Sequence, residues 1–284
     1  MIMPAYNCAD VIDAQLQALA AQDYAHSFSV VVSDNGSTDG LRAHVQNHRL
    51  ASELNLTYVD ASGSSGASYA RNRGAESAAG EYLAFCDADD AVHPSWLSRL
   101  VEALESADLV GTALEIDTLN SDRTRPAIPF AAAEHQGKNP FRPFVIGASM
   151  ACRASMYRVL GGMREDVRAS EDLEFSWRAQ GEGFRLAFVA EPLVAYRLRT
   201  GLRSHFKQAA ALGYGSAHVC GLYRAHGCPP FRIRHSMLAL LTMTVRNPLV
   251  PDVMGGIPAD LWTREVAGQL AVLRGGIRHR SLRW

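Results

Sequence analysis

A nine-residue stretch, Tyr82-Leu83-Ala84-Phe85-Cys86-Asp87-Ala88-Asp89-Asp90, joins an apolar run to three carboxylates. The apolar run has the length and composition of a buried strand, so the carboxylates follow the carboxyl end of that strand. Three negative charges within four residues repel one another unless cations or hydrogen-bond donors compensate them. Mg²⁺ and Mn²⁺ prefer hard oxygen ligands and commonly bind one or two carboxylates. The alternative is an acidic helix start, in which Asp90 caps the helix opened by Pro94.

Short apolar or β-branched runs alternate with segments of helical spacing through the first part of the chain. The predicted strands cover residues 1–3, 28–33, 54–59, 82–86 and 108–116. This rhythm predicts an α/β fold with a Rossmann-like, mostly parallel central sheet flanked by helices. Ligands of such sheets bind beyond the carboxyl ends of the strands. We therefore expect the two acidic turns, at residues 34–40 and 87–90, to face one crevice.

The second half of the chain begins with a loop rich in Pro and polar residues, predicted from Ser121 to Pro143. Beyond it we expect two strands and two helices, the second of which is capped by Ser170. The strands are predicted at 144–153 and 184–189, and the helices up to Gly161-Gly162 and at 171–180. After about Thr200 the pattern becomes wholly helical and more basic.

The composition is that of an ordinary globular protein, with 48% hydrophobic residues in 284. Twenty-eight Lys and Arg against 29 Asp and Glu give a net charge of −1, which provides no general reason to bind nucleic acid. The five cysteines form no CxxC pair, which argues against a zinc site or a disulfide framework. We find neither a secretory signal nor an apolar segment of spanning length, and expect a cytoplasmic protein.

The second acidic turn follows the strand predicted at 28–33. Asp34 can accept hydrogen bonds from a ribose hydroxyl or a base N–H at that position. For Ser37 and Asp39 an Asx turn with a helix cap is the simpler interpretation.

Two further segments carry charged groups suited to the same crevice. Arg71, on the helix predicted between Gly66 and Gly80, offers a planar donor fork for phosphate, although a solvated arginine face is the alternative. Glu171 and Asp172 begin a helix, where the helix dipole stabilises carboxylates. If that helix end faces the crevice, Asp172 can act as general base for an acceptor hydroxyl.

A cationic cluster follows the last predicted strand. It can offset the negative charge on a departing diphosphate; alternatively, it is a solvated segment that connects to the C-terminal helices. It contains Arg197, Arg199, Arg203, His205 and Lys207.

Taken in order, these segments resemble the inverting family 2 glycosyltransferases of GT-A fold. The resemblance covers about residues 1–200 and rests on seven motifs. They are Pro4-Ala5-Tyr6-Asn7, Ser33-Asp34-Asn35-Gly36-Ser37-Thr38-Asp39, Ala70-Arg71-Asn72-Arg73-Gly74 with Ala79-Gly80-Glu81-Tyr82, the Asp87–Asp90 run, Gly147-Ala148-Ser149-Met150-Ala151-Cys152-Arg153, Gly161-Gly162-Met163, and Ser170-Glu171-Asp172-Leu173-Glu174-Phe175-Ser176-Trp177-Arg178.

The resemblance implies a role for each matching residue. Asp172, with Glu171 beside it, is implied as the catalytic pair, with Asp172 taking the proton of the acceptor hydroxyl in a single inverting displacement. Asp89 and Asp87 are implied as ligands of Mn²⁺ or Mg²⁺, and His205 is a further metal candidate outside the motifs. The implied donor-binding residues are Pro4, Ala5, Tyr6, Asn7, Asp34, Arg71, Asp87, Ala88 and Asp89.

The resemblance also implies a domain organisation. A GT-A glycosyltransferase domain covers residues 1–200, with the donor half at about 1–115 and the acceptor half at about 116–200. Residues 201–284 form a helical C-terminal extension.

The expected reaction moves a sugar from a nucleoside-diphosphate donor, with a UDP-sugar as the first expectation, to a carbohydrate, lipid-linked or small-molecule acceptor. Two alternatives are an inactive relative that only binds the sugar nucleotide, and a nucleotidyltransferase. The second usually has a Gly-rich, basic loop after its first strand, where this chain has Tyr6-Asn7-Cys8-Ala9-Asp10.

The C-terminal helices have two interpretations. Their arginines lie beside apolar residues that can form a membrane-surface patch, peripheral at the inner membrane face; alternatively the helices cover a core or a homodimer interface. The patch residues are Leu240, Leu241, Val245, Leu261, Trp262 and Leu273, with Arg246, Arg264, Arg274, Arg278, Arg280 and Arg283.

Overall fold

The computed structural model describes residues 1–121 and 131–284, apart from the side chain of Asp252, and the described part divides into two compact units. The first unit comprises Met1–Leu119, Ala131–Asp166 and Glu171–Arg197. The second contains residues 120–121, Val167–Ser170 and Leu198–Trp284. The first unit carries the sheet, and the second is mainly helical.

The sheet of the first unit has eight strands in the order β3-β2-β1-β4-β7-β6-β8-β5. Their bounds are β1 Ile2–Ala5, β2 Val30–Asp34, β3 Leu56–Asp60, β4 Tyr82–Cys86, β5 Ala91–Val92, β6 Leu109–Glu115, β7 Ser149–Arg153 and β8 Leu186–Ala195. The pairs β2–β3, β1–β2, β1–β4 and β6–β8 are parallel. The pairs β4–β7, β6–β7 and β5–β8 are antiparallel. The predicted α/β fold with a mostly parallel sheet is confirmed.

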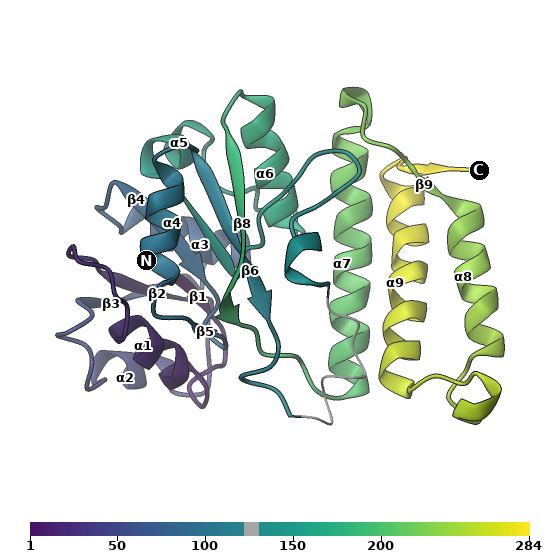
Figure 1. The fold of residues 1–284 in the computed structure, drawn as a ribbon, viewed down its shortest axis with the longest axis horizontal. Helices are drawn as coiled ribbons and strands as arrows, with labels where there is room; N and C mark the ends of the chain where they lie inside the picture. Colours follow the sequence, from purple (N-terminus) through teal and green to yellow (C-terminus); the bar gives the residue numbers. More distant parts are fainter. Residues whose placement is uncertain (122–130) are drawn as a thin grey trace. The chain divides into compact units, whose positions relative to one another are not determined.

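Six helices flank this sheet in the described part of the first unit (Figure 1). They are α1 Ile12–Ala20, α2 Leu41–Gln46, α3 Ala67–Glu76, α4 Trp96–Leu104, α5 Ala154–Val159 and α6 Glu171–Gly181. The amphipathic pattern of α4 buries Trp96, Leu97, Leu100 and Leu104, as its sequence predicts.

One local prediction was wrong in its extent. The strand predicted at 144–153 is shorter: only Ser149–Arg153 forms β7, and Ile146 makes an isolated bridge to Ser149. Residues 122–130, within the predicted long loop, lie outside the described residues.

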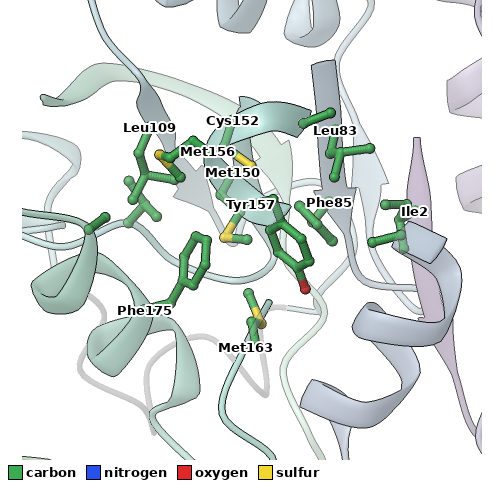
Figure 2. Close-up of a cluster of buried hydrophobic side chains, with 14 residues drawn as sticks. Ile2, Leu83, Phe85, Leu109, Met150, Cys152, Met156, Tyr157, Met163 and Phe175 are labelled. Carbon is green, nitrogen blue, oxygen red and sulfur yellow. The ribbon is translucent and has the colours of Figure 1, made fainter. Parts of the chain in front are cut away.

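A buried hydrophobic cluster fixes α5 and α6 against the sheet (Figure 2). The ring of Tyr157, on α5, stacks on Phe85 of β4 at a centroid distance of 5.4 Å. It also contacts Phe175 of α6 at 5.3 Å. Burying aromatic rings contributes strongly to packing. The start of α6, with Glu171 and Asp172, is therefore held rigidly relative to β4.

Helix α3 lies close to β1 and β2 because Gly74 has no side chain. A Cβ at Gly74 would lie 2.6 Å from Cγ2 of Ile2 and 3.3 Å from Cβ of Ser33. Only glycine permits this approach. Arg71, one turn earlier on α3, is thereby brought next to the sheet and buried.

The second unit is built on three helices, α7 Leu202–Leu222, α8 Ile233–Val245 and α9 Ala259–Arg278. Helix α9 packs between α7 and α8 (Figure 1). Small residues permit its close contact with α7, since a Cβ at Gly213 would lie 2.5 Å from the carbonyl oxygen of Gly268. Two short strands, β9 Phe231–Arg232 and β10 Leu282–Arg283, pair in parallel. None of the helices described is both long enough and apolar enough to cross a bilayer.

Candidate functional site at the carboxyl ends of the strands

The carboxyl ends of β1, β2 and β4 lie at one edge of the sheet because these strands are parallel neighbours. The register pairs Ala5, the last residue of β1, with Asp34, the last residue of β2. Asp34 is paired in turn with Asp60 on β3. The segment Asp87–Asp90 directly follows β4. The two acidic turns predicted from the sequence therefore follow the same edge.

Asp34 is buried, with 3% of its surface exposed, and three donors hold its carboxylate. The backbone N–H and the hydroxyl of Ser37 donate to Oδ1 at 2.8 and 2.6 Å. The hydroxyl of Tyr58 donates to Oδ2 at 2.8 Å. Burial, and then the bond to Asp34, raise the pKa of Tyr58 to about 12, so Tyr58 remains a donor at neutral pH. These three donors therefore fix the carboxylate of Asp34 in position.

Asn7 ties the first turn to the second. Its backbone is left-handed, with φ of 48°, which Asn tolerates better than most residues. The Asn7 amide N–H donates to Oγ of Ser37 at 2.8 Å, and its Oδ1 accepts the N–H of Thr38 at 2.8 Å. Asp39 contributes a third link, because its Oδ2 accepts the N–H of Ala9 at 2.8 Å.

Tyr6, which directly precedes Asn7, is exposed, and Pro4 is half-buried. The first turn therefore presents an aromatic ring to solvent next to the residue that binds the second turn.

Arg71 joins three segments of the chain through two ion pairs. Its Nη2 donates to Oδ1 of Asp87 at 2.8 Å, and its Nη1 donates to Oε1 of Glu171 at 2.7 Å. Only 4% of the Arg71 side chain is exposed. Burial alone would lower the pKa of Arg71, but the charges of Asp87, Glu171 and Asp172 outweigh burial and raise it. The alternative of a solvated arginine face is wrong, since this guanidinium is an internal counter-ion.

Asp172 lies beside this network and is held by backbone donors. Its Oδ2 accepts the N–H of Gly147 at 2.9 Å, and its Oδ1 accepts the N–H of Leu173 at 2.8 Å. Burial, followed by the charge of Glu171, raises the pKa of Asp172 to about 6, against the opposing effects of the Gly147 N–H and Arg71. A carboxylate with a pKa near 6 is ionised at neutral pH and basic enough to accept a proton.

Asp90 does not cap a helix, so that alternative is wrong. It is fully buried, and its Oδ1 accepts the backbone N–H of Arg197 at 2.7 Å. Burial and then the charges of Asp87 and Asp89 raise the pKa of Asp90 well above its ordinary value. Arg197 also donates from Nε to the carbonyl oxygen of Asp89 at 2.6 Å. The third carboxylate of the run therefore anchors the segment after β8, whereas Asp87 and Asp89 are half-buried.

The electrostatic environment of Cys8 places the remaining carboxylates in one neighbourhood. Burial first, and then the charges of Asp89, Asp39 and Asp34, raise the pKa of its thiol to about 12. The charges of Asp34 and Asp89 thus both raise the pKa of the Cys8 thiol, and the charges of Asp87 and Asp172 both raise the pKa of Arg71. Ala88, between Asp87 and Asp89, is buried.

Two residues that matter for this geometry were missed in the sequence. Gln15 of α1 is buried, and its amide donates to the carbonyl oxygen of Asp87 at 3.0 Å and accepts the N–H of Val92 at 2.9 Å. In the sequence, Gln15 is recognisable as a polar residue at a position on the apolar face of α1. Gly147 was read only as part of a motif, although a Cβ there would lie 2.9 Å from Nη2 of Arg71.

The described residues contain one cluster of His and Asp side chains with metal-ligand spacing, outside the predicted donor set. Asp13, His44 and His48 bring their ligand atoms within 4.8 Å of one another. Nδ1 of His48 accepts the N–H of Leu50 at 3.3 Å, which places the hydrogen of the neutral ring on Nε2, toward Asp13. The bond to His44 is the largest of the effects that lower the pKa of Asp13. In this arrangement the carboxylate of Asp13 accepts from the imidazole rings of both His44 and His48.

His205, the additional metal candidate, lies in the second unit and is buried there. Its Nε2 is 2.6 Å from the carbonyl oxygen of Arg199, and its Nδ1 is 3.3 Å from Oδ1 of Asp260. Both ring nitrogens therefore face oxygen atoms of their own unit.

Comparison with known proteins identifies relatives over most of the chain. The sequence model described as Glycosyl transferase family 2 matches residues 1–161. The Amylovoran biosynthesis glycosyltransferase AmsB of Erwinia amylovora is 25% identical over 220 residues, which are 73% of this chain and 72% of the relative.

Two solved structures share the fold. The mannosyltransferase PcManGT of Pyrobaculum calidifontis, in complex with GDP-Man and Mn²⁺, superposes with a TM-score of 0.64 at 19% identity, over 96% of this chain and 86% of that one. S. aureus TarS 1-349, in complex with UDP-GlcNAc, gives a TM-score of 0.58 at 17% identity, over 99% and 91% of the two chains.

Proposed function

Because this chain belongs to glycosyl transferase family 2 and is a glycosyltransferase, we propose that it transfers a sugar from a nucleoside-diphosphate donor to an acceptor hydroxyl with inversion at the anomeric carbon. The observation that carries the proposal is the pair of bonds by which Arg71 joins Asp87 to Glu171, with Asp172 beside them. These contacts join the acidic segment after β4 to the start of α6, which supports assigning the first to phosphate binding and Asp172 to proton transfer.

The nucleoside half of the donor would bind at the ends of β1 and β2. Asp34 is held by Ser37 and Tyr58, so its carboxylate is positioned to accept hydrogen bonds from a ribose or base. The exposed ring of Tyr6 offers a stacking surface beside it. A UDP-sugar is the donor we would test first, because TarS 1-349 was solved with UDP-GlcNAc.

The residues present fit a divalent cation at Asp87 and Asp89. Burial first, and then the charges of Asp87 and Asp89, raise the pKa of Asp90 against the opposing effect of Arg197, so both carboxylates add negative charge at this point. Carboxylate oxygens suit Mn²⁺ or Mg²⁺, and PcManGT was solved with Mn²⁺. A bound cation would supply charge neutralisation for the diphosphate.

Asp172 is the proposed general base. It would take the proton of the acceptor hydroxyl while the hydroxyl oxygen forms a bond to the anomeric carbon and the bond from that carbon to the diphosphate breaks. Attack from the face opposite the nucleotide inverts the configuration. Glu171 is engaged by Arg71 and has only 13% of its side chain exposed, so we assign it to positioning Arg71. The Gly147 N–H orients the carboxylate of Asp172.

The test measures release of nucleoside diphosphate from a panel of nucleotide sugars with Mn²⁺ or Mg²⁺. Asp172→Asn and Asp89→Ala should each lower turnover by about two orders of magnitude or more. Glu182→Gln, which removes an exposed carboxyl just after α6, is the matched control and should retain activity. NMR of the product should show the anomeric configuration opposite to that of the donor.

Two results would refute parts of this assignment. Full turnover by both Asp172→Asn and Asp89→Ala would end the proposed mechanism. Donor binding without transfer to any acceptor, measured by calorimetry, would instead favour the inactive-relative alternative.

A further inference from the structure

Helix α8 and the segment after it expose an unusual number of large apolar side chains. Their exposed fractions range from 55% for Met237 to 96% for Val253. We call this set the apolar face; it consists of Met237, Leu238, Leu241, Val245, Leu249, Val253 and Met254. A group of large exposed apolar side chains is typical of a binding site for a protein or a membrane.

The helical members of the apolar face share one side of α8. Residues 237, 238, 241 and 245 follow the spacing of a single helical stripe. Other residues of α8 face α9 instead, where the indole N–H of Trp262 donates to the carbonyl oxygen of Met243 at 2.8 Å. The apolar face is therefore left uncovered by its own unit.

The exposed side chains correct the composition of the membrane-surface patch that the sequence predicts. Leu241 and Val245 are exposed, whereas the other four apolar residues are partly covered and serve the packing of the helices. These four are Leu240, Leu261, Trp262 and Leu273.

The charge around the apolar face is strongly positive. Residues 198–284 contain 12 Lys and Arg but only three Asp and Glu, and no carboxylate occurs between Glu191 and Asp252. In the sequence, Arg232 and Arg234 precede the apolar face, and Arg246 lies within it, between Val245 and Leu249. All three arginines are exposed.

These charges distinguish between two candidate occupants of the apolar face, a second copy of the chain and a membrane surface. In a twofold dimer the same patch would meet itself, so three arginines of each copy would approach those of the other, with Asp252 as the one carboxylate in residues 231–254 to pair with them. Anionic lipid headgroups, in contrast, supply phosphate groups that arginine binds well, above acyl chains that accept the apolar side chains. We propose that the apolar face docks on an anionic membrane surface.

Docking of this kind needs no spanning helix. An apolar stripe flanked by cations lies in the plane of the headgroups, and its affinity combines buried apolar area with electrostatic attraction. The proposal is independent of the transfer chemistry, because it rests on residues outside the candidate site.

The experiment is flotation of the full-length chain with vesicles, either of phosphatidylcholine alone or of phosphatidylcholine with phosphatidylglycerol. The wild type should float with the anionic vesicles at low salt and be released as salt rises. Leu238→Ser with Leu241→Ser should weaken partitioning at least about tenfold. Arg234→Gln with Arg246→Gln should do the same.

Matched controls come from the first unit. Val159→Ser removes a valine that is 75% exposed on α5, and Arg185→Gln removes an exposed arginine. Both should float as the wild type does, and circular dichroism should show that all variants are folded.

Two outcomes would overturn the proposal. One is a protein that stays in the aqueous fraction with anionic vesicles at low salt, or whose flotation is unchanged in both double variants. The other is a wild-type dimer in light scattering that Leu238→Ser with Leu241→Ser converts to a monomer, without flotation, which would assign the apolar face to a second copy.

Discussion

The guanidinium of Arg71 and the carboxylate of Asp87 form a 2.8 Å ion pair that joins α3 to the acidic segment after β4. Because the same guanidinium binds Glu171, it also fixes the start of α6. A single buried cation thus holds the proposed phosphate-binding segment beside the proposed base. Its removal would leave two carboxylates without their counter-ion.

Arg71→Met should therefore destabilise the protein by about 3–5 kcal/mol, the usual cost of breaking a buried pair. Arg71→Lys should recover part of that loss, because lysine keeps the charge but lacks the fork that reaches both carboxylates. The free energy of unfolding, measured by urea denaturation, tests both. Arg73→Met is the control: Arg73 is on the same helix but 42% exposed, and it pairs only with the exposed Glu76 among the contacts described. Equal stability of Arg71→Met and Arg73→Met would contradict the role assigned to Arg71.

The pKa of Asp172, raised to about 6 mainly by burial, predicts a pH dependence. Below that pH the carboxyl is protonated and cannot accept a proton, so kcat/KM should rise with pH through about 6 and level off above it. The same group affects stability in the opposite direction. Its folded-state pKa lies above the ordinary 3.8, so the stability it contributes is present below about pH 4 and lost as pH rises through about 6.

A kcat/KM profile between about pH 5 and pH 8 tests the first expectation. Asp172→Glu should shift the ascending limb, whereas Glu182→Gln should leave it in place. A profile without an ascending limb near pH 6 would exclude Asp172 as the base.

Asp90 is predicted to act by anchoring the chain after β8. Asp90→Asn keeps an oxygen that can accept the N–H of Arg197 and removes a carboxyl whose ionisation burial opposes. It should retain wild-type stability at neutral pH. Asp90→Ala should lose about 1–3 kcal/mol, since the Arg197 N–H is then left without its acceptor. Thermal unfolding of the two variants compares them, and equal losses would contradict the anchoring role.

The sequence predicted the elements well where the pattern is local. The apolar run 82–86 corresponds to β4, and the periodic leucines of α4 are buried. The acidic ends of β2 and β4 were correctly expected at one edge, since parallel strands share their carboxyl end.

Contacts between distant segments could not be predicted in this way. Asp90 matches the sequence pattern of a helix cap, yet it binds a backbone N–H 107 residues away. Gln15 bonds residues 72 and 77 positions further along. Nothing in the local pattern of residues 149–153 indicates that β7 is inserted antiparallel between β4 and β6. Such features depend on tertiary packing, which periodicity does not report.

Gly147 provides a test of how tightly the site is packed. An alanine Cβ there would lie 2.9 Å from Nη2 and 3.1 Å from Cζ of the buried Arg71, so the guanidinium or the Gly147 backbone must shift. Either shift disturbs the bonds from Arg71 to Asp87 and from the Gly147 N–H to Asp172. Gly147→Ala should therefore cost about 1–3 kcal/mol of stability and lower kcat more than it raises the KM for the donor, because it displaces the proposed base.

The control for this substitution is Gly181→Ala, at the end of α6. A Cβ there would meet only Nη1 of Arg142, at an ordinary 3.5 Å. Alanine in a helix is favoured over glycine by about 0.5–1 kcal/mol, so this variant should be as stable as the wild type or slightly more so, with unchanged kcat. Urea denaturation and initial rates on both variants distinguish the two positions. If Gly147→Ala behaves like Gly181→Ala, the space around Arg71 is not tightly packed, and the geometry assigned to Asp172 loses its physical basis.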